Sequence, residues 1–403
     1  VGDGPITGAT VEIFNVKGVL ISTETSDNTA SYKSSFKVRP QEYPLILKVS
    51  DGIDLVTGDA PDFELVSIMM NKSSSTANIN PFSTLIVKMA QSMAGGANTD
   101  NINYATAVVM EKFSFGLDSN AIDNPVTNRI SSKNIAQIVK ASEALGEMIR
   151  RTRDQISATG NSISGDDVVN AIAADMADGF LDGIGAIGSD PTIAAVANVV
   201  TGQVLVETMT NTLKVNGVMA TGVIDQAIAT THASAKSSQM SDSVHITSGL
   251  INQTKQSVAA AQILDSSARL TDLAADIDSI SAGTSSAEAS RVLSDDASQW
   301  LENAVTMASA ADSQTVVAIN LVANNAPVPG AGADEPVAGG EPDTGSSDPV
   351  VNDPPPPVVE DPPPVVEDPP PPVVENTPPK VTGSPTTSII ASNSYSFKPG
   401  ASD

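Results

Sequence analysis

The hydrophobic pattern of the chain changes between Phe63-Glu-Leu-Val-Ser-Ile-Met-Met70 and Asn80-Pro-Phe-Ser-Thr-Leu85. The first stretch is a short apolar run, which favours a β-strand. The second places Asn before Pro, as is typical of the first residues of an α-helix, and it leads into apolar residues at helical spacing, namely Leu85, Ile86, Met89 and Met93. The sequence therefore predicts strands before Asn71 and helices after Asn80.

The region before this change is rich in strand patterns. Thr10 to Asn15 alternates, which places Val11 and Ile13 on one face, and Leu45, Leu47 and Val49 alternate in the same way. A further strand is expected over Ser31 to Val38, and turn residues separate these runs. Short strands at about ten-residue spacing predict a small antiparallel β-sandwich over residues 1–75.

Residues 80–325 carry helical patterns. The clearest helix runs from Asn134 to Ile156, and Arg150, Arg151 and Arg153 near its end suit the negative pole of the helix dipole. Asp190-Pro191 begins another helix. Later stretches are rich in Ala and Ser and are more weakly patterned. We expect six to nine helices with short connections in this α-helical domain.

A change in composition marks the end of the helical domain. Eighteen of the 27 prolines fall within residues 327–379, together with 11 acidic residues and neither Lys nor Arg. This window includes the repeats Asp353–Glu360, Asp361–Glu367 and Asp368–Glu375. Such a tract favours extended polyproline II structure and predicts a spacer with a reach of roughly 160 Å at about 3.1 Å per residue. The alternative is a ligand for a proline-recognition groove.

The whole chain of 403 residues is acidic, with a formal net charge of −26. Nucleic acid and anionic membranes are therefore not expected as partners, because both require a basic surface. The absence of Cys excludes disulfide scaffolds, thiolate metal sites and thiol nucleophiles. No apolar run approaches the roughly 20 residues of a transmembrane helix, so no transmembrane segment is expected. The sequence begins at Val1, and we expect a leader before it.

The first 15 residues contain Gly8-Ala-Thr-Val11 at the start of a predicted strand. In this they resemble the opening of carboxypeptidase-regulatory-like (transthyretin-like) β-sandwich domains, a resemblance that covers about 70 residues. The stretch Asn80-Pro-Phe-Ser-Thr-Leu85 is similar to the helix start that follows such domains in secreted bacterial surface proteins. The resemblance implies a secreted, modular protein, and it implies no catalytic residue.

The other end of the chain carries Asn376-Thr-Pro-Pro-Lys-Val-Thr-Gly-Ser-Pro-Thr-Thr-Ser388 and Asn393-Ser-Tyr-Ser-Phe397. These residues resemble the first two strands of a bacterial Ig-like (cadherin-like) repeat, although Lys398-Pro399-Gly400 departs from the usual pattern. Residues 380–403 would then begin an Ig-like domain that continues in a longer protein. Such repeats form stalks on extracellular proteins of Gram-negative bacteria, so the resemblance implies a location that is secreted, on the cell surface or extracellular.

Candidate catalytic groups are few. His232 and His245 are 13 residues apart, which fits no metal-ligand signature, and we expect both to be solvated or packed. The chain has no Gly-x-Ser-x-Gly elbow. Ser34 and Lys37 lie on a predicted strand, where their spacing places them on opposite faces. The glycines within 179–188 follow a predicted helix, and a helix-to-helix connection is favoured over a dinucleotide-binding loop. No catalytic residue and no cofactor is predicted.

A weak calcium site is the one metal hypothesis. Its candidate ligands lie in the loops of the β-region and are Asp51, Asp54, Asp59 and Asp62. The alternative is that these are plain solvated acids. Other acidic pairs show no loop spacing of a dedicated site; they are Asp166-Asp167, Asp276 with Asp278, and Asp295-Asp296.

Taken together, the sequence predicts an α+β multidomain chain: a small N-terminal β-sandwich, an α-helical domain, an extended proline-rich linker and a partial Ig-like segment. The predicted function is that of a non-enzymatic structural protein of the bacterial cell surface or biofilm matrix, as an adhesin stalk or a self-assembling filament subunit. Its expected partners are copies of itself, because Ala- and Ser-rich helices gain from extended packing, or other surface proteins. Two alternatives remain. One is a secreted carbohydrate- or ligand-binding module, although Trp300 and four Tyr offer few sugar platforms; the other is an accessory region of a secreted enzyme.

Overall fold

The computed structural model describes residues 1–232, 246–294, 296–325, 380–382 and 400–402. The chain divides into two compact units, Val1–Ala333 and Asp334–Asp403. In the second unit the described residues form two strands, β9 (Lys380–Thr382) and β10 (Gly400–Ser402), which pair antiparallel. The predicted linker over 327–379, and all of the predicted Ig-like segment except these two strands, lie outside the described residues.

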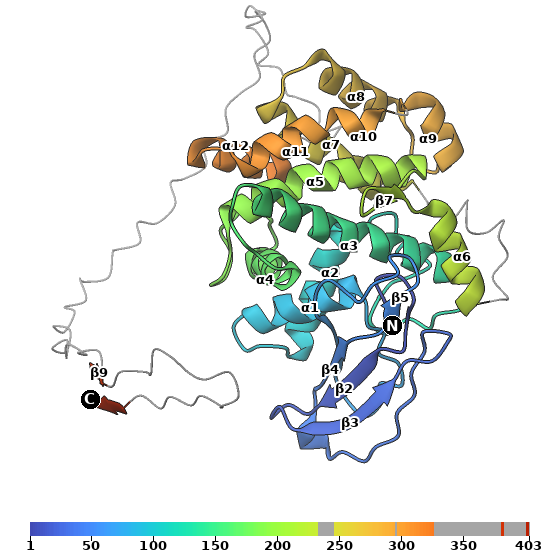
Figure 1. The fold of residues 1–403 in the computed structure, drawn as a ribbon, viewed down its shortest axis with the longest axis vertical. Coiled ribbons are helices and arrows are strands. Elements are labelled where there is room, and N and C mark those ends of the chain that lie inside the picture. Colours follow the sequence, from blue (N-terminus) through green and yellow to red (C-terminus); the bar gives the residue numbers. More distant parts are fainter. Residues whose placement is uncertain (233–245, 295, 326–379, 383–399, 403) are drawn as a thin grey trace, which may run out of the picture. The chain divides into compact units, whose positions relative to one another are not determined.

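The N-terminal part of the first unit consists of short strands, as predicted (Figure 1). The larger sheet is antiparallel with the order β3-β2-β4-β6, and a smaller sheet pairs only β1 with β5. A helix layer, rather than a second sheet of comparable size, packs against the larger sheet. The strands are β1 (Ile6–Thr7), β2 (Thr10–Phe14), β3 (Leu20–Thr25), β4 (Leu45–Ser50), β5 (Ile53–Asp54) and β6 (Leu65–Met69).

The register of the central strands follows the predicted alternation. Val11 lies opposite Val49 and Ile13 lies opposite Leu47, and all four side chains are buried. The strand expected over residues 31–38 differs from the prediction, because this described segment forms neither a strand nor a helix and pairs with neither sheet. Its side chains hold it in place instead, and the Tyr32 hydroxyl donates to the carbonyl of Ala77 at 2.6 Å.

Helix α1 (Pro81–Ser92) completes the edge of the sheet at β6. The side chain of Asn80 caps the helix by accepting from the Ser83 amide at 2.8 Å. The Ser83 hydroxyl donates to the carbonyl of Val66 at 2.7 Å, and the Val66 amide donates to Thr84 Oγ1 at 2.9 Å. The hydroxyls of the Asn-Pro-Phe-Ser-Thr-Leu motif thus satisfy backbone groups of an edge strand that would otherwise be buried without partners.

Replacing Thr84 by Val is expected to lower the free energy of unfolding by about 1–3 kcal/mol, because the buried Val66 amide loses its acceptor. Thr208→Val is the matched control, since the buried Thr208 hydroxyl donates to the Val204 carbonyl, which also belongs to the helical ladder. We expect that control to cost less than about 1 kcal/mol. Urea unfolding followed by circular dichroism measures both, and equal losses would contradict the role of Thr84.

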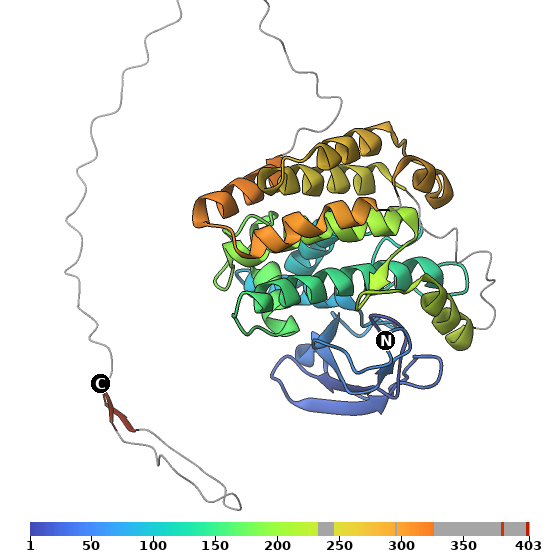
Figure 2. The same ribbon diagram turned by 45° about the horizontal axis from the view of Figure 1, so that its top comes forward.

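The helices form successive layers above the sheet (Figures 1 and 2). Next to α1 come α2, α3 and α4, then α5, and beyond it α7, α11 and α12, with α8 against the far side of α7. Their number exceeds the six to nine expected, because the last part of the unit folds as several short helices. The bounds are α2 (Thr99–Lys112), α3 (Ile135–Ala158), α4 (Gly165–Asp175), α5 (Pro191–Thr210), α6 (Thr221–Thr231), α7 (Ser248–Leu264), α8 (Ala268–Ser279), α9 (Ser286–Val292), α10 (Ala297–Trp300), α11 (Glu302–Ser309) and α12 (Ser313–Asn325).

Smaller elements lie between these helices. They are the 3-10 turns η1 (Pro40–Glu42) and η2 (Met176–Asp178) and the strands β7 (Lys214–Val215) and β8 (Val218–Met219), which pair as a hairpin.

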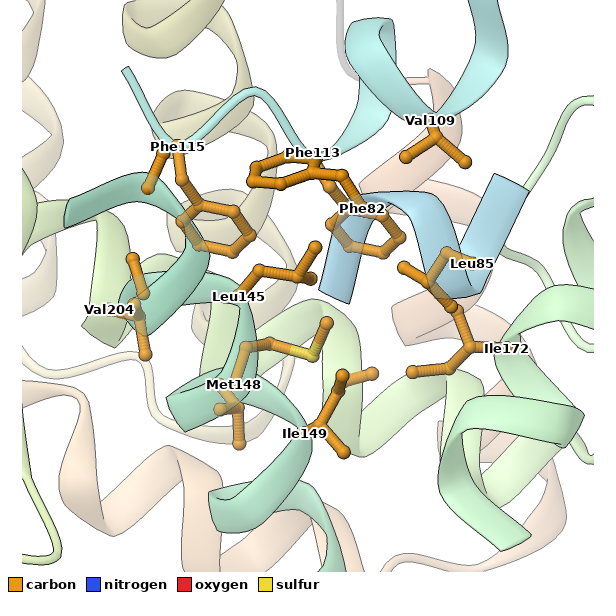
Figure 3. Close-up of a cluster of buried hydrophobic side chains, with 14 of the residues drawn as sticks. Phe82, Leu85, Val109, Phe113, Phe115, Leu145, Met148, Ile149, Ile172 and Val204 are labelled. Carbon is orange, nitrogen blue, oxygen red and sulfur yellow. The ribbon is translucent and has the colours of Figure 1, made fainter. Parts of the chain in front are cut away.

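One hydrophobic core runs through the strands and the helices. Figure 3 shows its middle, where Phe82 and Leu85 of α1 face Leu145, Met148 and Ile149 of α3. Helix α5 is long and apolar enough to cross a membrane by length and composition alone, but 89% of its most apolar window is buried in the unit. Core helices can have the same length and composition, and α5 packs against other helices within the unit.

Candidate functional site

A cluster of charged side chains lies buried where the N-terminal strands meet helix α3. Asp3 precedes β1, Asp54 ends β5, and Glu143, Glu147 and Arg150 come from α3 at spacings that place them on one helix face. Each of the five is at most 4% exposed. Charged groups are seldom buried to this extent unless they are paired or bind an ion.

Arg150 is the centre of this cluster. Its Nη1 lies 2.5 Å from Asp3 Oδ2, its Nη2 lies 3.4 Å from Glu143 Oε2, and its Nε lies 2.9 Å from Glu147 Oε2. Burial disfavours the guanidinium charge, but Asp3, Glu143 and Glu147 outweigh that effect and raise the pKa of Arg150 well above its ordinary value. The single guanidinium group of Arg150 therefore pairs with three buried carboxylates.

Arg151 extends the network to helix α5. Its Nε lies 2.9 Å from Glu147 Oε1, and its Nη2 lies 2.8 Å from Glu207 Oε2. Its Nη2 also donates to the backbone carbonyl of Lys214 at 2.8 Å. The sequence had suggested that Arg150 and Arg151 complement the helix dipole. That prediction was wrong, because α3 continues to Ala158 and both arginines pair with buried acids instead.

Two glycines make room for the acids. A Cβ atom at Gly146 would overlap the Asp3 carboxylate, and one at Gly4 would overlap both Asp54 Oδ1 and Glu143 Oε1. The backbone also orients Asp54, whose Oδ2 accepts from the Gly4 amide at 3.2 Å and whose Oδ1 accepts from the Val56 amide at 2.7 Å. The Asp54 and Glu143 carboxylates therefore lie near each other in the space that a side chain at position 4 would fill.

The cluster carries an excess of acid. Within the network just described, five carboxylates (Asp3, Asp54, Glu143, Glu147 and Glu207) face the two guanidinium groups of Arg150 and Arg151. Burial raises the pKa of Asp3 to about 7 and raises that of Asp54. Burial, reinforced by Asp3 and Asp54, raises the pKa of Glu143 well above its ordinary value. Chemically, such a group of acids either retains protons or binds a cation.

The four acids predicted as calcium ligands do not converge. Asp54 belongs to the buried cluster, whereas Asp51 is exposed and accepts from the hydroxyls of Thr10 and Ser50 at 3.3 and 3.2 Å. Asp59 is exposed in the loop after β5. Asp62 is also exposed and pairs with Arg153 at 3.1 Å, with a longer contact of 3.8 Å to Arg150.

The remaining candidates from the sequence lie elsewhere. His232 caps the end of α6 and is half-buried, and burial lowers its pKa; His245 lies outside the described residues. Ser34 Oγ donates to Glu24 Oε1 at 2.5 Å, and Lys37 is exposed. The glycines within 179–188 connect η2 to α5, which confirms the predicted helix-to-helix connection.

No protein-family model, curated protein or solved structure matches this chain. The two resemblances drawn from the sequence therefore remain predictions.

Proposed function

We propose that the chain is a non-enzymatic structural protein of the bacterial cell surface or extracellular matrix. In this proposal residues 1–325 form one rigid body, and the proline-rich tract after it serves as a spacer. Copies of the body associate with one another or with other surface proteins.

The observation that carries the proposal is the use of buried charge to join distant parts of the chain. Arg150 connects α3 to Asp3, 147 residues away, and Arg151 connects α3 to Glu207 of α5. The Glu64 amide beside β6 also donates to Asp166 of α4 at 2.8 Å, across 102 residues. These contacts fix the strand region to α3 and α4 and fix α3 to α5, which suits a body that moves as one rigid unit.

The sequence supplies the second part of the proposal. Like charges and prolines in the repeats of residues 353–375 resist collapse. A tract of this composition would keep the folded body before it at a distance from the part of the chain after it. A rigid body next to an extended acidic spacer is an arrangement suited to display at a surface.

A ligand-binding module is the second candidate, because the unit contains a cavity of about 500 Å³ between the sheet, residues 29–36 and α3. This volume falls in the range of small-molecule sites, roughly 300–1,000 Å³. Its wall includes the apolar side chains of Ile13, Phe36, Met69 and Ile135, with Tyr32 as a polar aromatic group. The two candidate functions differ in what they require of this cavity: a ligand-binding module requires a ligand in it, and a structural protein does not.

Two measurements test the proposal, one of where the protein is located and one of whether it self-associates. Antibodies against residues 1–325 should label the surface of producing cells or their extracted matrix in immunogold electron microscopy. Light scattering after size-exclusion chromatography should show a mass that rises with protein concentration. Label confined to the cell interior would overturn the proposal, and a constant monomer mass without fibres would overturn self-association.

Cooperative unfolding is expected for the fragment 1–325. Because one core joins strands and helices, far-UV circular dichroism and the fluorescence of Trp300, the single Trp of the chain, should report the same midpoint. Residues 1–75 alone should stay unfolded, since they lose α1 and α3 as packing partners. Two separate transitions in the fragment 1–325, or a folded 1–75 peptide, would show that the strand region is an independent domain.

A further inference from the structure

We propose that Asp3, Asp54 and Glu143 bind a calcium ion inside the first unit, and that this ion holds the N-terminal strands against helix α3. One potential ligand atom from each of the three carboxylates lies within 4.8 Å of the others. Calcium binds oxygen at 2.3–2.6 Å, so ligands on opposite sides of it lie about 5 Å apart, and these separations fit within its coordination sphere.

The free oxygens of the cluster point to a ligand. Arg150 engages Oδ2 of Asp3 and Oε2 of Glu143. Within the described part of the chain, the other oxygens of the same carboxylates, Asp3 Oδ1 and Glu143 Oε1, have no hydrogen-bond partner. Asp3 is 4% exposed and Glu143 is fully buried. A buried carboxylate oxygen without a partner is destabilising, and a cation that contacts both oxygens removes that penalty.

The third carboxylate is already positioned for the same ion. The amides of Gly4 and Val56 fix Asp54, and its Oδ1 lies on the same side of Gly4 as Glu143 Oε1. A carboxylate oxygen that accepts one hydrogen bond from a backbone amide keeps a second lone pair for a metal ion. Asp54 can therefore bind the cation without losing its own backbone contacts.

The charge balance favours a divalent ion. Across the whole network, five carboxylates face the guanidinium groups of Arg150 and Arg151, which leaves three negative charges when all the acids are ionised. One calcium ion offsets two of these charges, whereas a monovalent ion offsets only one. Oxygen-only ligands also favour a hard cation over zinc or copper.

A route from solvent and room for further ligands are both present. The lining of the cavity of about 500 Å³ includes Asp3, Gly4 and Ser142, so the cavity borders the cluster at Asp3. Ser142 Oγ is buried and, among the described residues, is another side-chain atom without a hydrogen-bond partner. Water in this cavity would supply the coordination positions that three carboxylates leave open, because calcium takes six to eight ligands.

The experiment measures thermal unfolding of the full chain after removal of metals with EDTA and dialysis. Addition of CaCl2 well above the dissociation constant is expected to raise the melting temperature by about 5 °C or more, with a stoichiometry of one ion per chain by calorimetry. Glu143→Gln keeps the shape of the side chain and removes one anionic ligand. It should fold at least as stably as the parent in EDTA and should lose the calcium-dependent rise.

The matched control is Asp51→Asn, which neutralises an exposed acid of the same region and should leave the calcium response unchanged. No effect of CaCl2 on the parent chain, by either measurement, would overturn the site and leave the cluster as a protonated network. A response that persists in Glu143→Gln but disappears in Asp51→Asn would place the ion in the surface loops instead. A response to MgCl2 alone would overturn the assignment to calcium.

Discussion

Replacing Arg150 by Met is expected to lower the free energy of unfolding of the first unit by about 3–5 kcal/mol. The methionine fills much of the same space, but it leaves Asp3, Glu143 and Glu147 buried without the cation that contacts all three. The loss should be measured by urea unfolding in EDTA, so that a bound metal cannot compensate for the missing charge.

Arg153→Met is the control for this experiment. Arg153 lies on the same helix, but its side chain is more exposed, and its partners Asp62 and Asp154 are partly or largely exposed to solvent. Surface ion pairs of this kind contribute at most about 1 kcal/mol. Equal losses in the two variants would mean that burial of the Arg150 network has no special effect on stability.

A double variant separates the charge of Arg150 from its packing. Glu143→Gln combined with Arg150→Met removes one buried carboxylate together with the buried guanidinium, so it should recover part of the stability lost in Arg150→Met. Failure to recover any stability would indicate that Arg150 acts through its shape alone.

The sequence was most informative where a short-range pattern determines the structure. Alternation over Thr10–Asn15 and the Asn80-Pro81 helix start both predicted the elements that form. The Ala- and Ser-rich end of the unit was harder to predict, because its helices gain stability from close packing and not from a strong apolar face. Gly202 of α5 illustrates this, since a Cβ atom there would lie only 2.9 Å from Ser257 Cβ of α7.

The buried cluster was largely invisible in the sequence. Asp3 and Arg150 are 147 residues apart, and the chain gives no local sign that they meet. Glu143, Glu147 and Arg150 do recur at the spacing of one helix face, but that face lies roughly opposite the apolar stripe that includes Leu145, Met148 and Ile149, so the pattern alone indicates a solvated charged face. Of the four loop acids considered as calcium ligands, only Asp54 belongs to the cluster, because a loop position does not determine where a side chain points.

Replacing Phe82 by Ala is expected to cost about 3–5 kcal/mol, because it removes a fully buried ring at the junction of the strand and helix layers. Figure 3 places this ring beside Phe113 and Leu145, so the cavity left behind would be lined by α1, the segment after α2, and α3. Phe180→Ala is the matched control: Phe180 is 46% exposed, Lys112 Nζ lies 5.4 Å from its ring centroid, and its loss should cost less than about 1.5 kcal/mol.

Trp300 gives this last experiment its second readout. It lies on α10, which packs against α5 on the side away from the sheet (Figure 1). If strands and helices unfold as one unit, Phe82→Ala should shift the fluorescence midpoint of Trp300 as far as it shifts the circular dichroism midpoint. A shift in circular dichroism with an unchanged Trp300 midpoint would show that the layers near the sheet unfold separately, and the proposed rigid body would then be smaller than residues 1–325.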